Sequence, residues 1–162
     1  MSFRVGHGFD AHRLGEGRPF VLGGVRIPFE RGPLGHSDGD SLAHAVADAL
    51  LGAGNLGDLG RHFPDSDPQW KDVDSLRLLE ACARMVREAG YEILNIDATV
   101  VVEAPKLAPH LDAVRARLAE ALRIDSSSVS VKAKTSEGMG YTGDGSGIAA
   151  YAVAALERSR SR

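Results

Sequence analysis

Asp10, His12 and His44 have the residue types of a site for a divalent metal ion. One carboxylate and two imidazoles can hold zinc and leave a fourth coordination position open, as catalytic zinc sites do. The chain has a single cysteine, Cys82, and therefore cannot build a closed thiolate site. Short Asp-x-His patterns also occur often by chance, and both histidines are compatible with ordinary surface or capping positions. Spacing alone leaves both interpretations open.

Asp10 and His12 follow directly on a predicted strand at the start of the chain. In that strand Phe3, Val5 and Phe9 alternate with arginine and glycine, a pattern typical of a half-buried strand. Side chains two positions apart on a strand point to the same side. Asp10 and His12, at or just beyond the end of the strand, can therefore hold one ion together.

His44 belongs to a predicted helix that runs from Asp40 to Ala53, where Asp40 can accept hydrogen bonds from the free amides of the first turn. Aspartate is a poor residue for a helix interior, so Asp48, one turn after His44, requires an explanation. A carboxylate four residues from a ligating histidine can orient its ring and raise its basicity. Asp48 is therefore a candidate for supporting the metal site.

The remaining elements mix strands and helices. The patterns predict a hairpin of Phe20–Leu22 and Val25–Ile27, a glycine-rich loop over 29–39, a long loop over 54–71, a helix over Ser75–Ala89, a strand over Ile93–Val102, a helix over Pro109–Arg123, a strand over Val129–Lys134, a glycine-rich loop over Gly138–Gly147 and a closing helix over Ile148–Arg158. The early hairpin favours an α+β fold, in which helices pack on one mixed sheet, over a doubly wound parallel sheet. No repeat or linker divides the chain, so residues 1–162 are expected to form a single domain.

Composition excludes several classes of protein. The net charge of −3 argues against general nucleic-acid binding. No apolar stretch is long enough to span a membrane, and the N-terminus lacks the apolar run of a signal peptide. Together with the single cysteine, these features predict a cytoplasmic protein without a membrane partner. The basic run from Arg158 to Arg162 is interpreted as a solvated chain end.

A second group of residues suggests phosphate binding. Lys132, Lys134, Thr135 and Ser136 precede a glycine-rich loop that leads into the predicted closing helix, and backbone amides at a helix start can hold phosphate. Glu137 would be unusual in a pure anion site, but it can bridge to phosphates through Mg2+. A glycine-rich turn capped by a glutamate is the simpler alternative.

The segment Gly138-Met-Gly-Tyr-Thr-Gly143 satisfies the G-x-G-x-x-G pattern of dinucleotide-binding folds. That fingerprint also needs a further strand that carries an acidic residue about twenty positions on, and the sequence ends first. A nucleotide-cofactor fold is therefore rejected. Asp58, Asp65 and Asp67 place three carboxylates on the long loop. Asp65 and Asp67 can serve as turn formers before Pro68 or accept hydrogen bonds from substrate hydroxyls, and spacing does not decide between the two.

Several segments, taken together and in order, resemble the 2-C-methyl-D-erythritol 2,4-cyclodiphosphate synthase family. The resemblance covers nearly the whole chain. The segments that carry it are Gly6-His-Gly-Phe-Asp10-Ala-His12, Leu22-Gly-Gly-Val-Arg-Ile-Pro28, His36-Ser-Asp-Gly-Asp40, Asp48-Ala-Leu-Leu-Gly52, Leu56-Gly-Asp58, Phe63-Pro-Asp-Ser-Asp67, Ala104-Pro-Lys106 and Lys132-Ala-Lys-Thr135-Ser-Glu137. Such a set is far more specific than any one motif, and it favours the metal interpretation of Asp10, His12 and His44.

The resemblance implies a reaction and an assembly. The substrate would be 4-diphosphocytidyl-2-C-methyl-D-erythritol 2-phosphate, an intermediate of the non-mevalonate route to isoprenoids. Its 2-phosphate would attack the β-phosphorus of the same molecule, which gives the cyclic 2,4-diphosphate and CMP. The family's active sites lie across subunit boundaries, so the resemblance also implies a homotrimer.

The resemblance also implies roles for particular residues. Asp10, His12 and His44 would hold zinc or another divalent cation, and Glu137 would help to hold Mg2+ or Mn2+ at the diphosphate. His36 and Thr135 would be catalytic, because they would donate to charge that develops in the transition state. The residues that would contact the substrate are Asp10, His12, His36, Ser37, Asp58, Leu59, Gly60, Phe63, Pro64, Asp65, Ser66, Asp67, Val102, Glu103, Ala104, Pro105, Lys106, Leu107, Ala108, Ala133, Lys134, Thr135, Ser136, Glu137 and Tyr141.

The chain departs from the family's pattern at one place. Many members read Arg-Gly-Glu-Gly where this chain has Asp144-Gly-Ser-Gly147, and in some of them that arginine borders a cavity that holds prenyl diphosphates. Asp144 would repel such an anion, so this binding is not expected. Two other functions remain as alternatives: a non-catalytic, metal-dependent module that binds a nucleotide or diphosphate, and a metal-dependent phosphohydrolase that uses a zinc-bound hydroxide.

Overall fold

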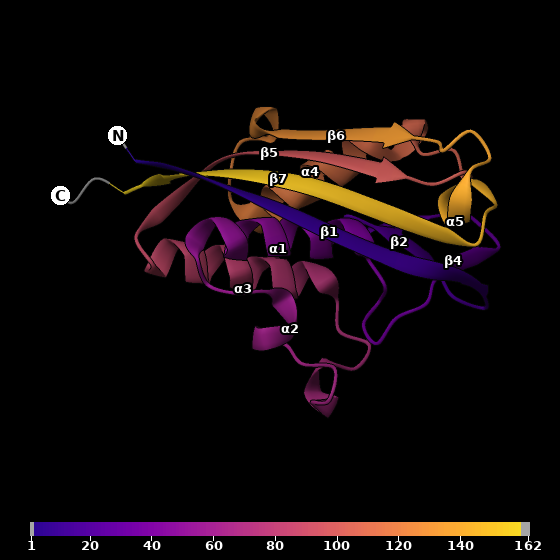
Figure 1. Cartoon of the computed structure of the whole chain (residues 1–162), viewed down its shortest axis with the longest axis horizontal. Coiled ribbons are helices and arrows are strands. Elements are labelled where there is room, and N and C mark those ends of the chain that lie inside the picture. Colours follow the sequence, from indigo (N-terminus) through magenta and orange to yellow (C-terminus); the bar gives the residue numbers. More distant parts are fainter. Residues whose placement is uncertain (1, 160–162) are drawn as a thin grey trace.

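One five-stranded sheet, with helices packed on one of its faces, organises the chain. The structure is a computed structural model and describes residues 2–159. The strand order is β4-β1-β7-β5-β6, and among its neighbouring pairs β5 and β6 are parallel while the other three pairs are antiparallel. Figure 1 shows β7 between β1 and β5, with α1 and α3 side by side beneath the strands. The single-domain α+β fold with a mixed sheet is therefore confirmed.

The elements have the following bounds. The strands are β1 (Phe3–Glu16), β2 (Phe20–Leu22), β3 (Val25–Ile27), β4 (Arg31–Pro33), β5 (Tyr91–Val101), β6 (Val129–Lys134) and β7 (Gly147–Arg158), and β2 and β3 pair only with each other. The helices are α1 (Ser41–Gly54), α2 (Leu59–His62), α3 (Ser75–Glu88), α4 (Leu111–Leu122) and α5 (Gly140–Gly143), with single turns η1 (Pro68–Trp70), η2 (Ala108–His110) and η3 (Ser126–Ser128). The predicted hairpin and the three long helices are confirmed, whereas the two long loops contain short helices and the loop over 29–39 contains β4.

The closing helix predicted over Ile148–Arg158 is wrong, because this segment is strand β7. It pairs with β1 on one side and with β5 on the other, so it lies at the centre of the sheet. Its alanines favour a helix when considered alone. In the fold they serve another purpose: Ala150, Ala152 and Ala154 form the face against which α1 packs, where larger side chains would hold the helix away from the sheet. Tertiary packing thus overrides local propensity.

The first strand is longer than predicted, and its buried face is the opposite one. Phe3, Val5 and Phe9 are 59%, 70% and 47% exposed, so the prediction that they form a half-buried core face is wrong. The buried positions of β1 are Gly6, Gly8 and Leu14, which lie on the other face of the strand. A Cβ atom at Gly8 would lie 1.8 Å from the carbonyl oxygen of Ala45, and this contact excludes every residue except glycine. The missing side chains let α1 pack backbone against backbone on β1.

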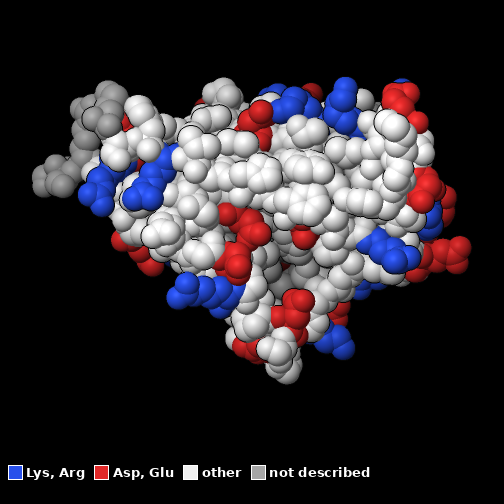
Figure 2. Space-filling view, viewed as in Figure 1, with Lys and Arg blue, Asp and Glu red and all other residues white. Residues whose placement is uncertain are grey.

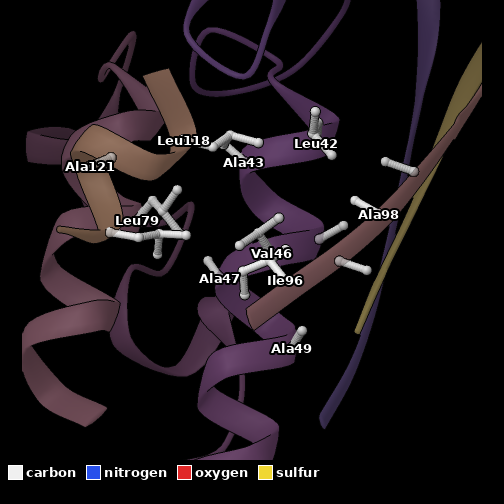
Figure 3. Packing of buried hydrophobic residues seen from close by; sticks show 14 of the residues in the cluster. Leu42, Ala43, Val46, Ala47, Ala49, Leu79, Ile96, Ala98, Leu118 and Ala121 are labelled. Carbon is white, nitrogen blue, oxygen red and sulfur yellow. The ribbon is translucent and has the colours of Figure 1, made fainter. Parts of the chain in front are cut away.

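The core lies between the sheet and the helices, with α1 at its centre. Leu42 and Val46 on α1 and Ile96 on β5 are completely or almost completely buried. Figure 3 shows α1 between the strands on one side and Leu79 and Leu118, from α3 and α4, on the other. Cys82 is part of this core, and burial raises the pKa of its thiol to about 12, which agrees with the prediction of an inert, buried thiol.

Two further findings concern the ends of the chain and membranes. The basic run predicted to be a solvated chain end lies largely outside the described residues, from residue 160 on. Within residues 2–159, no helix is both long and apolar enough to cross a membrane.

Asp40 connects the hairpin to the start of α1, as its predicted capping role requires. Its carboxylate accepts hydrogen bonds from the amides of Gly23 at 2.9 Å, Gly24 at 2.7 Å and Ala43 at 3.0 Å. Burial raises the pKa of this carboxyl to about 6, and the three amides act in the opposite direction. The side chain is fully buried, so no water can replace these contacts.

Asp40→Ala is expected to lower the free energy of unfolding by about 3 kcal/mol, because a helix cap is lost and buried amides are left unpaired. Urea unfolding followed by circular dichroism measures this loss. Asp125→Ala is the matched control, since Asp125 caps η3 at an exposed position and should cause a much smaller change. Equal losses in the two variants would contradict the role assigned to Asp40.

Candidate active site

Asp10, His12 and His44 converge on one point. Oδ2 of Asp10 lies 2.8 Å from Nε2 of His12 and 3.1 Å from Nδ1 of His44, and the two ring nitrogens are 3.5 Å apart. Ligand atoms that surround a tetrahedral zinc ion are separated by roughly 3.3 Å, given bonds of about 2.0 Å. The three atoms thus have the types and the spacing of a three-ligand site for a divalent cation.

The fold brings these residues together through β1 and α1. Asp10 and His12 lie within β1 rather than after it, on the same face as Gly6 and Gly8. The close contact of this face with α1 places His44, in the first turns of the helix, over Asp10. The expectation that residues two apart on a strand share one ion therefore agrees with the geometry.

The ring nitrogens that face away from this point also have partners. Nδ1 of His12 donates to the carbonyl oxygen of Leu34 at 2.8 Å. Nε2 of His44 lies 2.8 Å from Oγ of Ser75 and 3.2 Å from Oγ of Ser37. Such outer contacts fix the tautomer and orientation of ligating histidines.

Asp48, which the sequence suggested as the group that orients His44, has another hydrogen bond. Its Oδ1 accepts from the amide of Leu59 at 2.7 Å and so ties α1 to α2. Burial raises the pKa of its carboxyl, and the nearby charge of Asp58 does so too. Asp48 lines the same cleft as His44, and an effect of its charge on the imidazole stays a prediction.

Contacts within the cluster shift the pKa of Asp10 and that of His12. Burial acts to raise the pKa of Asp10, but hydrogen bonds with His12 and His44 outweigh it and lower that pKa. Burial acts to lower the pKa of His12, and the hydrogen bond and charge of Asp10 outweigh it and raise that pKa. Asp10 is therefore an ionised carboxylate that attracts cations, either protons on the histidines or a metal ion.

The three ligands border a cleft with a volume of about 260 Å³. The residues that line it are Asp10, His12, His36, Ser37, His44, Asp48, Leu59, Gly60, Phe63, Asp65, Trp70, Val73 and Leu78. Figure 2 shows acidic side chains gathered around a hollow beneath a broad uncharged band. The lining contains three aspartates and neither lysine nor arginine among the described residues. A phosphate ester would therefore need a cation in order to bind here.

Trp70, Val73 and Leu78 are lining residues that sequence reasoning missed. Trp70 packs edge-on against Phe63, with 5.0 Å between the ring centroids. A tryptophan in a loop rich in glycine, aspartate and proline was the one available signal, because a large aromatic side chain needs a surface to cover. The other two lie on or beside α3, which nothing in the sequence connected with the cleft.

His36 supplies an unpaired polar atom to the cleft. Its Nε2 is buried and has no hydrogen-bond partner among residues 2–159. An unpaired buried nitrogen is costly unless a ligand satisfies it. His36 therefore has the position of a group that contacts a bound molecule.

Part of the predicted substrate loop lies outside the cleft lining. Asp58 caps α2 through a hydrogen bond from the amide of Arg61, and Asp67 caps η1 through one from the amide of Gln69. Both carboxylates thus have a local structural role, which for Asp67 agrees with its interpretation as a turn former. Pro64 and Ser66 are exposed beside the lining residues Phe63 and Asp65.

The residues predicted to bind the diphosphate and the cytidine, here called the second group, lie at the far edge of the sheet and comprise residues 102–108, 133–137 and Tyr141. The segments over 102–108 and 133–137 follow the parallel strands β5 and β6, and the amide of Val102 donates to the carbonyl oxygen of Lys134 at 3.1 Å. Thr135 Oγ1 donates to Glu137 at 3.2 Å. Tyr141 is 47% exposed on α5. The long helix expected after this group is strand β7, and the helix that begins before it, α5, has four residues, so the argument for a phosphate cradle at the start of the closing helix is wrong.

Within one chain the two groups are far apart. In the sheet register, Asp10 pairs with Ala150, Ala150 with Val100, and Val100 with Ala133. Three strand spacings therefore separate Asp10 from Ala133, which amounts to roughly 14 Å. None of the described residues over 102–108 or 133–137 lines the metal cleft.

Comparison with known proteins decides the family. Residues 3–157 match the YgbB family. The chain belongs to the YgbB family. Its relatives include proteins named 2-C-methyl-D-erythritol 2,4-cyclodiphosphate synthase from Bacillus velezensis and Burkholderia thailandensis. The Bacillus protein is 54% identical, over 97% of this chain and 99% of its own length. The Burkholderia protein is 55% identical, over 98% of both chains. The resemblance seen in the sequence is confirmed.

Several solved structures have the same fold. The bifunctional IspDF from Campylobacter jejuni matches with a TM-score of 0.94 at 41% identity, over 97% of this chain and 42% of that longer chain. A CDP-bound 2C-methyl-D-erythritol-2,4-cyclodiphosphate synthase matches with a TM-score of 0.88 at 41% identity, over 95% of this chain and 100% of the other. The CDP complex of IspF from Plasmodium falciparum matches with a TM-score of 0.86 at 31% identity, over 98% of both chains.

Proposed function

We propose that this protein converts 4-diphosphocytidyl-2-C-methyl-D-erythritol 2-phosphate into 2-C-methyl-D-erythritol 2,4-cyclodiphosphate and CMP. A bond forms between an oxygen of the 2-phosphate and the β-phosphorus. The bond from the β-phosphorus to the oxygen that bridges to the α-phosphorus breaks, and CMP leaves with that oxygen. The reaction is intramolecular, so it needs positioning and charge neutralisation rather than a covalent nucleophile or an activated water.

The observation that carries this proposal is the Asp10, His12 and His44 cluster at the edge of an acidic cleft, in a member of the YgbB family. The full-length relatives named cyclodiphosphate synthase agree with it, as do the CDP-bound structures of related proteins. A binding module or a phosphohydrolase would also use a metal cluster. Neither is favoured by a specific feature of this cleft.

The donor set fits a divalent cation, for which zinc is the expected ion. Asp10, His12 and His44 would hold this cation, which when bound polarises a phosphate oxygen and offsets its charge. His36, with its unpaired Nε2, can donate to a phosphate oxygen as charge develops. Ser37, Leu59, Gly60, Phe63 and Asp65 would surround the methylerythritol end of the substrate.

The second group would bind the other end of the substrate. Glu137 would hold Mg2+ or Mn2+ at the diphosphate. The hydroxyl of Thr135 would donate a hydrogen bond to an oxygen of the diphosphate. The exposed Lys106 and Lys134 carry positive charge, which the metal cleft lacks. The backbone over 102–108 and 133–137, with Tyr141, would hold the cytidine. The roughly 14 Å between the groups in one chain supports an active site that takes its second half from another subunit.

The uncovered face of the sheet supports assembly into a homotrimer. Phe3, Val5, Phe9, Tyr151 and Val153 are each at least 40% exposed on this face, opposite the helices. They coincide with the uncharged band in Figure 2, which runs along β1 and β7. A contiguous apolar patch of this kind is typical of a protein interface. Packing of these faces around a threefold axis would bury them and bring the second group of one subunit to the metal cleft of the next.

Phosphorus NMR with the diphosphocytidyl substrate tests the proposed reaction. With Zn2+ and Mg2+ supplied, the expected products are a cyclic diphosphate and CMP, and a chelator should abolish both. Retention of the intact substrate would indicate a binding module. A linear monophosphate or inorganic phosphate would indicate a phosphohydrolase, and either result would contradict the proposal.

A further inference from the structure

A chain of hydrogen bonds extends behind the metal ligand His44. Its Nε2 lies 2.8 Å from Oγ of Ser75, the first residue of α3, which is 1% exposed. The Ser75 hydroxyl in turn lies 2.5 Å from Oδ1 of Asp38, a distance typical of a hydroxyl that donates to a carboxylate. A buried serine thus joins a carboxylate to the histidine.

The carboxylate of Asp38 determines which groups donate and which accept in this series of hydrogen bonds. Both oxygens of the Asp38 carboxylate accept backbone amides, and a carboxylate can only accept, so the Ser75 hydroxyl donates to it. The Ser75 oxygen is then left with lone pairs, and these accept the Nε2–H of His44. With the proton held on Nε2, Nδ1 of His44 can offer its lone pair to a cation bound by Asp10 and His12, in place of the hydrogen bond that it otherwise shares with Asp10.

Asp38 is itself held in place from several sides. Its Oδ2 accepts the backbone amide of Ser75 at 3.0 Å, and its Oδ1 accepts the amide of Asp40 at 3.1 Å. The amide of Asp38 donates to the carbonyl oxygen of Val73 at 3.3 Å. The carboxylate therefore cannot turn away from Ser75 without losing these contacts, and the chain of hydrogen bonds is preorganised.

We propose that Ser75 and Asp38 are positioning residues of the metal site, which hold His44 in the tautomer and orientation that bind the divalent cation. The inference rests on the metal site included in the proposed function. It also separates the roles of the two serines near His44. Ser75 takes the ring N–H at 2.8 Å, and Ser37, at 3.2 Å, keeps its hydroxyl available to a ligand in the cleft that it lines.

Ser75→Ala removes the hydroxyl alone. The backbone bond to Asp38 and the cap that Asp74 provides do not depend on it, so α3 should begin as before. Ser41→Ala is a closely matched control, because Ser41 is also a buried serine at the first position of a helix of 14 residues. The hydroxyl of Ser41 has no hydrogen-bond partner among residues 2–159.

The test measures zinc affinity of the metal-free protein by competition with a chelator, without any substrate. Ser75→Ala should bind Zn2+ about 10-fold to 100-fold more weakly, and Ser41→Ala should match the unaltered protein. Histidine ring nitrogen–proton NMR spectra of the metal-free Ser75→Ala protein should show a larger share of the Nδ1–H tautomer of His44. Ser75→Thr keeps the hydroxyl and should return the affinity to within about threefold of the unaltered value.

Equal zinc affinities of Ser75→Ala and Ser41→Ala, with an unchanged tautomer, would overturn the inference. If Ser75→Ala does not fold, Asp38→Asn carries the test: about tenfold weaker zinc binding supports the inference, and unchanged binding overturns it. Failure of the unaltered protein to bind zinc would be a different result, because it would refute the metal site of the proposed function itself.

Discussion

Replacing His44 by alanine is expected to remove zinc and catalytic activity together. Two ligands remain in His44→Ala, and Asp10 and His12 alone cannot fix a tetrahedral ion that has to present an open position to a phosphate. The rate of CMP release should fall by about three orders of magnitude, because charge stabilisation by a bound metal contributes several kcal/mol to a phosphoryl-transfer transition state. Metal content per chain and CMP release, measured on the same sample, test both parts of the prediction.

His110→Ala is the control for this experiment. His110 lies on η2, outside the cleft lining, and should retain both zinc and activity when it is replaced. Thermal unfolding of the metal-free proteins shows whether His44→Ala still folds. A folded His44→Ala protein that keeps zinc and turns over substrate would remove His44 from the site.

The sequence was sufficient to predict that Asp10, His12 and His44 come together, because local geometry determines most of this arrangement. Strand periodicity alone places Asp10 and His12 on one side, wherever the strand ends. Capping preference places the start of α1 at Asp40, and therefore places His44 one turn into the helix. These relations depend on neighbours in the chain, so they hold without knowledge of the fold.

The errors arise where packing between distant segments decides the outcome. Glycine pairs in a strand look like weak positions, but Gly6 and Gly8 form the contact surface for α1. The alternation of Phe3, Val5 and Phe9 with arginine and glycine predicts a half-buried strand with these three inward, and they instead form its exposed face. Likewise, alanine-rich β7 became a central strand because both of its neighbours pair with it. Periodicity reports which residues share a face, not what covers that face.

The supporting groups of the metal site show the same limit. Asp48 was a natural candidate for orienting His44, since it stands four residues away on the same helix. The group that contacts the ring is Ser75, which is 31 positions away in the sequence and arrives with another helix. A partner of this kind has no sequence signature, because serine at a helix start is common for reasons of capping alone.

Mixing two inactive variants is expected to restore activity if the active site spans two subunits. His44→Ala lacks one ligand of the proposed zinc ion but keeps Glu137. Glu137→Ala keeps all three zinc ligands but, at limiting Mg2+, lacks the second cation. In trimers that contain both chains at random in equal amounts, about one quarter of the sites combine the two intact halves. Coexpression with two different tags yields such mixed trimers, and CMP release per site should approach about one quarter of the unaltered value.

A second mixture also distinguishes a site shared by two subunits from a site within one chain. Chains that carry both substitutions are coexpressed with unaltered chains in equal amounts. If the site crosses a boundary, both contributing subunits must be unaltered, and about one quarter of the activity per site remains. If one chain holds the whole site, about one half remains and the first mixture stays inactive. The roughly 14 Å between Asp10 and Ala133 favours the first outcome, because neither group can move along a continuous sheet to meet the other.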